Sequence, residues 1–127
     1  MEAAPPFSGH VIGLLKTYMQ DLVEQAVQEE IATERFGFSP APYRSHDAIS
    51  DLLALLDDRI ESEGIQVGLS ETFLHTMWSL CDEVAPHVRE RVWIEENIDG
   101  GQTQIGKAKT REITYRVLIE VIERRSR

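Results

Sequence analysis

Residues 9–34 read GHVIGLLKTYMQDLVEQAVQEEIATE, and the spacing of their apolar residues decides the fold class. Polar pairs separate the apolar pairs, which are Val11/Ile12, Leu14/Leu15, Tyr18/Met19, Leu22/Val23 and Ala26/Val27. A repeat of this kind, with a period of about 3.6 residues, is typical of an amphipathic helix with a wide buried stripe. We therefore predict one long helix from Gly9 to about Glu34.

Four further helices are predicted along the chain. The second covers residues 46–63, the third residues 70–85 and the last residues 110–124. Because a proline ring clashes with the carbonyl four residues back, we predict a break or a kink near Ala85 and a fourth helix over residues 86–97. The apolar residues that we expect these helices to bury are Ile49, Leu52, Leu53, Leu56, Ile60, Phe73, Leu74, Met77, Trp78, Cys81, Ile113, Val117, Leu118, Val121 and Ile122.

Helical segments joined by mostly short loops predict an all-α, compact bundle of about five helices. A length of 127 residues is enough for one domain, over residues 1–127, to bury its own core. One alternative stays open for residues 92–106, VWIEENIDGGQTQIG, where alternating apolar residues and an Asp-Gly pair would also suit a β-hairpin.

Cysteine usage and the N-terminus point to a soluble protein. Cys81 is the only cysteine, so no intramolecular disulfide can form, which is typical of a reducing compartment. The N-terminus lacks the basic region of a signal peptide, and the later apolar run over residues 52–56 is far shorter than the ~20 residues of a membrane span. We expect a cytoplasmic or nuclear protein that does not associate with membranes.

The net charge of -9 is unevenly distributed. Residues 1–106 carry six Lys or Arg against nineteen Asp or Glu, whereas residues 107–127 carry seven basic residues against three acidic ones. An acidic body repels nucleic acids and membrane surfaces and favours basic partners. The basic C-terminal helix, residues 107–127, could instead contact nucleic acid, or its charges could pair with the acidic helices of its own chain.

Residues 75–87, HTMWSLCDEVAPH, gather two histidines, a cysteine and two acids. Glu83 and His87 have the i, i+4 spacing of a chelating pair, but they lie on either side of Pro86. Cys81 falls on the apolar side of the predicted helix, where a free cysteine usually behaves as a small hydrophobe. We expect no metal site here, since neither paired C-x-x-C nor H-E-x-x-H occurs in the chain.

Three aspartates suggest one catalytic alternative, a helical metal-dependent nucleotide phosphohydrolase. Asp47, Asp51 and Asp58 fall near one helical face, and the first helix offers further acids that could complete a cation site. The paired E-x-x-E arrangement that helical nucleotide pyrophosphohydrolases use is missing, because the only E-x-x-E joins Glu120 and Glu123. We expect no catalytic residues and no cofactor, and solvated acidic helix faces are the simpler interpretation.

Residues 36–45, FGFSPAPYRS, form a connector rich in proline and aromatic residues. Aromatic side chains on such connectors are common at surfaces that bind other proteins. With the acidic body, they favour a non-catalytic protein-binding module, such as an adaptor, a regulatory subunit or an inhibitor, with a basic protein partner. The predicted partner-binding residues are Glu24, Glu29, Glu30, Phe36, Phe38, Tyr43, Asp51, Asp57 and Asp58. The long first helix could equally pair with its own copy, so a homodimer stays open.

Overall fold

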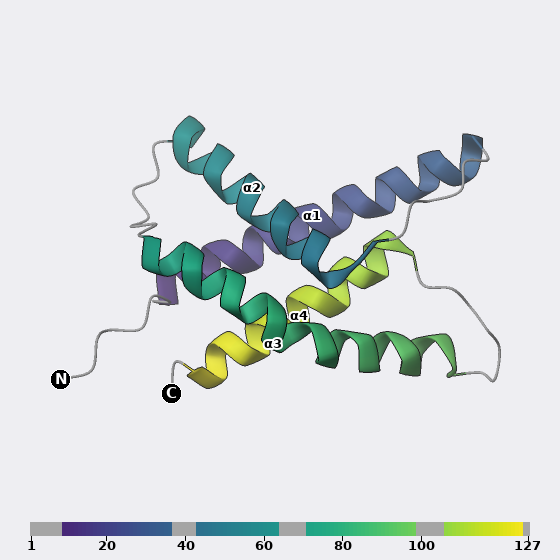
Figure 1. Cartoon of the computed structure of the whole chain (residues 1–127). Helices are drawn as coiled ribbons and strands as arrows, with labels where there is room; N and C mark the ends of the chain where they lie inside the picture. Colours follow the sequence, from purple (N-terminus) through teal and green to yellow (C-terminus); the bar gives the residue numbers. More distant parts are fainter. Residues whose placement is uncertain (1–8, 37–42, 64–70, 99–105, 126–127) are drawn as a thin grey trace.

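The computed structural model describes residues 9–36, 43–63, 71–98 and 106–125. These residues form four helices, α1 (Gly9–Phe36), α2 (Ser45–Glu63), α3 (Glu71–Glu96) and α4 (Lys107–Arg125), with no strand in the described part of the chain (Figure 1). The prediction of an all-α protein is confirmed, and the bounds predicted for the first, second and last helices agree with the structure to within three residues.

The last helix, α4, is the centre of the fold. It contacts each of the other three helices, and ten of its 19 residues are buried (Figure 1). It runs antiparallel to α1: Lys16 Nζ lies 3.1 Å from Glu123 Oε1 near one end, and Lys107 Nζ lies 2.7 Å from Glu29 Oε2 near the other. The segment that the sequence marks as basic is therefore the helix around which the others pack.

All four helices contribute side chains to one apolar core. On α2 and α4, every apolar residue predicted to be buried whose side chain is described is buried. Burial of this apolar surface provides most of the stability of such a fold. None of the helices that the structure describes is long and apolar enough to cross a membrane. The core consists mainly of Leu15, Tyr18, Met19, Leu22, Ala48, Ile49, Leu52, Leu53, Leu56, Met77, Leu80, Cys81, Val84, Val88, Ile113, Tyr115, Val117, Leu118, Val121 and Ile122.

The prediction near Ala85 was a break or a kink followed by a fourth helix. The separate fourth helix is wrong, because α3 continues through Pro86. Pro86 is exposed, so the Asp82 carbonyl that loses its backbone donor lies on the solvent side of the helix. Buried Val84 and Val88, on either side of the proline, hold both halves of the helix against the core. Figure 1 shows α3 changing direction near its middle, as expected for a proline kink. One bent helix replaces two predicted ones, which reduces the count from five to four in the described residues.

The alternative of a β-hairpin over residues 92–106 is not supported. Residues 92–96 are the last turn of α3, and residues 97 and 98 form a turn. Residues 99–105 lie outside the described residues, and α4 already begins at Lys107. Val92 packs against the core, which explains why residues 92–96 are helical although their apolar residues alternate as in a strand.

Two helices extend beyond the core. In α1 the last buried residue among those whose side chains are described, residues 11–32, is Ala26, although the helix continues to Phe36. In α3 the last buried residue is Val88, although the helix continues to Glu96. Figure 1 shows these two ends diverging from each other, with the start of α4 between them. We call them the α1 extension (residues 27–36) and the α3 extension (residues 89–98).

Candidate binding surface

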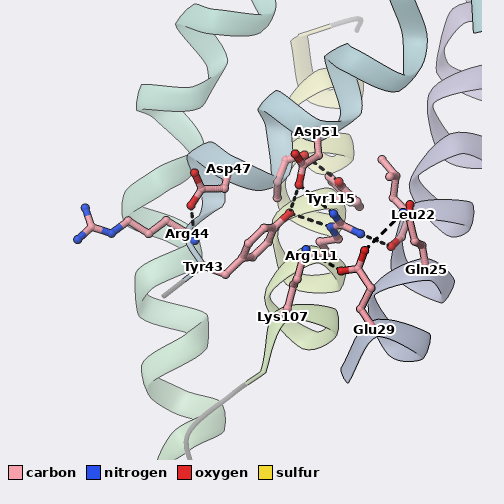
Figure 2. Close-up of polar contacts among 11 residues, drawn as sticks. Leu22, Gln25, Glu29, Tyr43, Arg44, Asp47, Asp51, Lys107, Arg111 and Tyr115 are labelled. Carbon is pink, nitrogen blue, oxygen red and sulfur yellow. Dashed lines mark hydrogen bonds and ion pairs between the residues drawn. The ribbon is translucent and has the colours of Figure 1, made fainter. Parts of the chain in front are cut away.

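The described polar contacts are most concentrated around Arg111 of α4, which is 3% exposed. Its Nη1 donates to the Leu22 carbonyl of α1 (2.6 Å), its Nη2 to Asp51 Oδ2 of α2 (2.8 Å) and its Nε to Tyr43 Oη (2.8 Å) (Figure 2). The Tyr43 hydroxyl in turn donates to Asp51 Oδ2 (2.8 Å). We call Arg111, Tyr43 and Asp51 the Arg111 cluster; it joins α1, α2 and α4.

Electrostatics keep Arg111 charged and the Tyr43 hydroxyl protonated. Burial disfavours the charge on Arg111, but the hydrogen bonds to Tyr43 and Asp51 outweigh it and raise the pKa of the guanidinium. Burial likewise raises the pKa of Tyr43, so its hydroxyl stays protonated. No buried side-chain nitrogen or oxygen among the described residues lacks a hydrogen-bond partner. A cluster whose polar groups are all satisfied stabilises the packing of helices and leaves no group aimed at a ligand.

The first turn of α4 is held by two acids of α1. Glu30 Oε1 accepts a hydrogen bond from the backbone N–H of Ala108 at 2.6 Å, which satisfies a donor at the helix N-terminus. The carboxylate of Glu30 also fills the space where Gly106 has no side chain, so a larger residue there would collide with it. Beside it, Lys107 pairs with Glu29 and lies 5.2 Å from the centre of the Tyr43 ring.

The predicted partner-binding residues therefore fall into three groups. Glu29, Glu30, Tyr43 and Asp51 all hold α1, α2 and α4 together, as Figure 2 shows for Glu29, Tyr43 and Asp51. The second group is exposed and has no ion pair or hydrogen bond with another described residue: Glu24, Asp57 and Asp58. The third group lies outside the description: the side chain of Phe36, and Phe38 as a whole. The role of all nine in binding a partner stays a prediction.

The stretch 75–87 does not bring its polar side chains to one point. Cys81 is buried, and burial raises the pKa of its thiol to about 11. His75 and His87 are exposed, while Glu83 pairs with Arg125 of α4. Within the described residues, no group of three histidine, cysteine or acidic side chains is placed to hold a metal ion.

The aspartates of α2 have separate roles. Asp47 Oδ2 accepts a hydrogen bond from the Arg44 backbone N–H at 3.0 Å, which caps the start of the helix. Asp51 pairs with Arg111, and Asp58 is exposed. These three carboxylates therefore do not converge as a cation site for phosphohydrolase chemistry requires.

The basic residues of α4 are largely neutralised by acids of the same chain. Arg111 is buried against Asp51, and Lys107 and Arg125 pair with α1 and α3. Lys109 and Arg116 lie within 4 Å of Glu112 Oε1, at 3.7 Å and 2.8 Å. Cations that are already paired attract phosphates weakly, so this arrangement gives little support to a nucleic-acid interface.

Apolar side chains exposed on α1 form a surface that the sequence did not single out. Val27 is 40% exposed and Ile31 is 55% exposed, whereas the spacing of residues 9–34 predicted that Val27 would be buried. With the partly buried Val23 they stand four residues apart, so they lie along one line on the helix. We call Val23, Val27 and Ile31 the α1 stripe. A shallow depression of about 440 Å³ lies beside Val23 and Val27, lined by Asp21, Val23, Glu24, Gln25, Val27 and Gln28.

The α3 extension carries a second exposed apolar surface. Trp93 and Ile98 are both 64% exposed, and Ile94 between them is 47% exposed. We call these three residues the α3 patch.

Trp78, also predicted to be buried, is 42% exposed, and the centre of its ring lies 5.3 Å from the centre of the His46 ring. The sequence did contain a signal for the α1 stripe, because residues 9–34 place apolar residues on more than one side of the helix.

No family model matches this chain, and no curated protein or solved structure matches it at a significant level. Function must therefore be inferred from the contacts and surfaces of the chain itself. The described contacts assign most charged residues to the stability of the fold. The surfaces that this leaves are the α1 stripe and the α3 patch.

Proposed function

We propose that this chain is a non-catalytic protein-binding module that presents exposed apolar residues on an acidic surface. The observation that carries the proposal is the course of α1 and α3 beyond the core. Both extensions carry large apolar side chains, among them Ile31 and Trp93, that no described residue buries. Contiguous exposed apolar residues with polar neighbours are typical of surfaces that another protein covers.

The energetics of short helices support the same proposal. Beyond the last buried residue, the helix continues for about two turns in α3 and about three in α1, and short helical segments with little packing are marginal in water. Most helix stability in proteins comes from packing of an apolar face, and the side chains of Ile31 and Trp93 have no such packing within the described fold. A partner that covers Ile31 or Trp93 would supply this packing.

The charge of the module favours a basic partner. The chain has a net charge of -9, and Glu24, Asp57 and Asp58 are exposed acids. Complementary charge steers a partner toward such a surface and raises its association rate. Glu29, Glu30 and Asp51 contribute less, because their charges are already used by Lys107, the α4 N-terminus and Arg111.

Affinity capture with matched surface variants tests the proposal. The wild-type chain, Val27→Ser/Ile31→Ser and Trp93→Ser/Ile98→Ser would be immobilised in equal amounts and exposed to extract from their native cells. Trp78→Ser serves as the control, because Trp78 is exposed but lies outside both surfaces. We expect a protein recovered in a fixed ratio by the wild-type and control chains and depleted by at least one double variant.

Two results would contradict the proposal. One is recovery of no stoichiometric partner. The other is equal recovery of the same partner by all four chains, which would remove both surfaces from consideration. A parallel melting experiment with Mg²⁺, Mn²⁺, Zn²⁺ and nucleotides tests the phosphohydrolase alternative, since a ligand that binds only the folded state raises the melting temperature.

A further inference from the structure

We infer that the α1 stripe is the docking site for an amphipathic helix of another protein, with Lys or Arg beside the apolar face of that helix. The inference rests on the proposed function, because it names the partner chemistry of one of the two exposed surfaces. It depends on three observations: the line of apolar residues, the depression beside it, and the charge around it.

The geometry of the α1 stripe suits a helix rather than a loop or a strand. Val23, Val27 and Ile31 form a straight apolar line over about 12 Å of α1, two turns long. The depression of about 440 Å³ beside Val23 and Val27 is shallow and open, so it would accept side chains without enclosing a small molecule. Helices that bind along such a line use anchors spaced at i, i+4 and i+7.

The charge around the α1 stripe selects a basic partner. Residues 17–34 contain five acidic residues and no Lys or Arg. Asp21 and Glu24 line the depression, are exposed and have no ion pair or hydrogen bond with another described residue. Basic side chains along one edge of a docked helix would therefore meet these unpaired carboxylates beside the apolar contact.

The same charge argues against a second copy of this chain at this position. In a twofold dimer each α1 stripe would face the other, and the acidic segment of residues 17–34, which includes Asp21 and Glu24, would meet the same segment of the second copy. Like charges brought together in an interface oppose association. The homodimer therefore becomes a distinct outcome of the test.

Synthetic peptides provide the probe. The first is a labelled peptide of about 18 residues, built from leucine and lysine with the leucines on one helical face. The second has the same composition in an order without helical periodicity, and the third replaces lysine by glutamate. Binding to the full chain would be measured by fluorescence anisotropy at low and high salt, with circular dichroism and melting temperature confirming that each variant is folded.

We expect the first peptide to bind at least about tenfold more tightly than the other two, and more weakly as salt increases. Val27→Ser/Ile31→Ser should weaken binding of the first peptide by about tenfold or more, because two anchors are lost. Asp21→Asn/Glu24→Gln should weaken it and reduce the salt dependence, whereas Asp82→Asn/Glu90→Gln, at exposed acids of α3, should leave it unchanged. Trp93→Ser/Ile98→Ser, the matched control on the α3 patch, should also leave it unchanged.

Other results would overturn the inference. Equal binding of the periodic and non-periodic peptides, or full affinity in Val27→Ser/Ile31→Ser, would show that the α1 stripe is not a helix-docking site. If the native partner were lost only in Trp93→Ser/Ile98→Ser, the inference would fail and the proposed function would stand. If sedimentation showed a dimer that Val27→Ser/Ile31→Ser dissociates, the occupant would be a second copy. Absence of any native partner would contradict the proposed function itself.

Discussion

Arg111 is a charged side chain inside an apolar core, and its environment shows why it is there. Removing a guanidinium from water is costly unless every donor finds an acceptor. Here Asp51, the Tyr43 hydroxyl and the Leu22 carbonyl accept from three of its nitrogens at 2.6–2.8 Å. The planar, forked shape of arginine allows one residue of α4 to bind α1 and α2 together.

We predict that the pair of Arg111 and Asp51 is energetically coupled. Arg111→Ala should lower the free energy of unfolding by about 3 kcal/mol, because it leaves Asp51 and Tyr43 without their partner. The Asp51 side chain is 41% exposed, so water can replace part of the loss and Asp51→Ala should cost less. Urea denaturation of both single variants and the double variant measures the coupling, which should be about 1 kcal/mol.

The matched control for this cycle is Arg91→Ala. It removes an ion pair with Glu120 whose side chains are 41% and 44% exposed. Exposed pairs contribute less than about 1 kcal/mol. An Arg111→Ala variant no less stable than Arg91→Ala would show that the Arg111 cluster does not hold the helices together.

Cys81 makes stability depend on alkaline pH. Burial raises the pKa of its thiol from 9.0 to about 11 in the folded state, while the unfolded chain keeps the ordinary value. Below pH 9 both states hold the proton, and as the pH rises through 9 toward 11 only the unfolded state loses it, so stability falls. At pH 10 the loss should be about 1 kcal/mol relative to pH 8.

The measurement is urea denaturation of the wild type and Cys81→Ala at both pH values. The wild type should lose more stability between them than the variant, because the variant has no thiol to ionise. Tyr43 and Tyr115, whose pKa values burial also raises, affect both proteins equally. Identical losses in both proteins would place the thiol in an environment that does not disfavour its charge.

At the scale of the helix, the periodicity of apolar residues predicted α1, α2 and α4, but it could not predict which of them lies at the centre of the fold. α4 looks basic and only weakly apolar, yet it is the central helix. The hydroxyls of its buried threonines form hydrogen bonds with backbone carbonyls four residues back. Thr110 Oγ1 donates to the Gly106 carbonyl and Thr114 Oγ1 to the Thr110 carbonyl. Such local bonds, and the partners of Arg111 on other helices, are invisible in the spacing of apolar residues.

Tertiary contacts likewise decide that α3 bends at Pro86 and does not end there. The steric rule that predicted a break is correct for the backbone at Asp82, but it does not include the packing of Val84 and Val88. Since the core holds both sides of the proline, a kink costs less than separating the two halves.

We predict that Glu30 stabilises α4 as its cap. Glu30→Gln should lower the free energy of unfolding by about 1 kcal/mol, because a neutral amide interacts less favourably with the helix N-terminus. Glu29→Gln weakens the partly exposed pair with Lys107 and should cost about half as much or less. Thermal denaturation of both variants provides the comparison, and an equal loss in the two would argue against the cap.

At the scale of the whole molecule, the sequence predicted the charge of the surface better than it predicted which residues are free to bind a partner. The acidic body and the exposure of Glu24, Asp57 and Asp58 follow from composition and helical spacing. The intramolecular roles of Tyr43 and Asp51 could not be predicted, because their partner Arg111 is at least 60 residues away in the chain. The position of Trp93 near Pro86 in the sequence makes it a candidate for a partner surface, but only the fold shows that it lies where α3 runs beyond its core.

Removal of the basic segment tests the architecture directly. We predict that a chain ending at residue 106 does not fold, because it loses the helix that contacts all three others. Circular dichroism should show a large loss of helix and no cooperative melting. A truncated chain that melts cooperatively would show that α4 is an appendage, and would revive its role as a separate nucleic-acid element.

Hydrogen exchange tests the central claim, that the two extensions are binding surfaces, most directly. In the free chain, amides of residues 27–32 and 89–96 should exchange faster than those of the buried parts of α1, α3 and α4, since few apolar contacts hold them. With the partner recovered by affinity capture bound, exchange in at least one of these two segments should slow. Protection confined to α4 or to the first half of α1, with both extensions unchanged, would contradict the account.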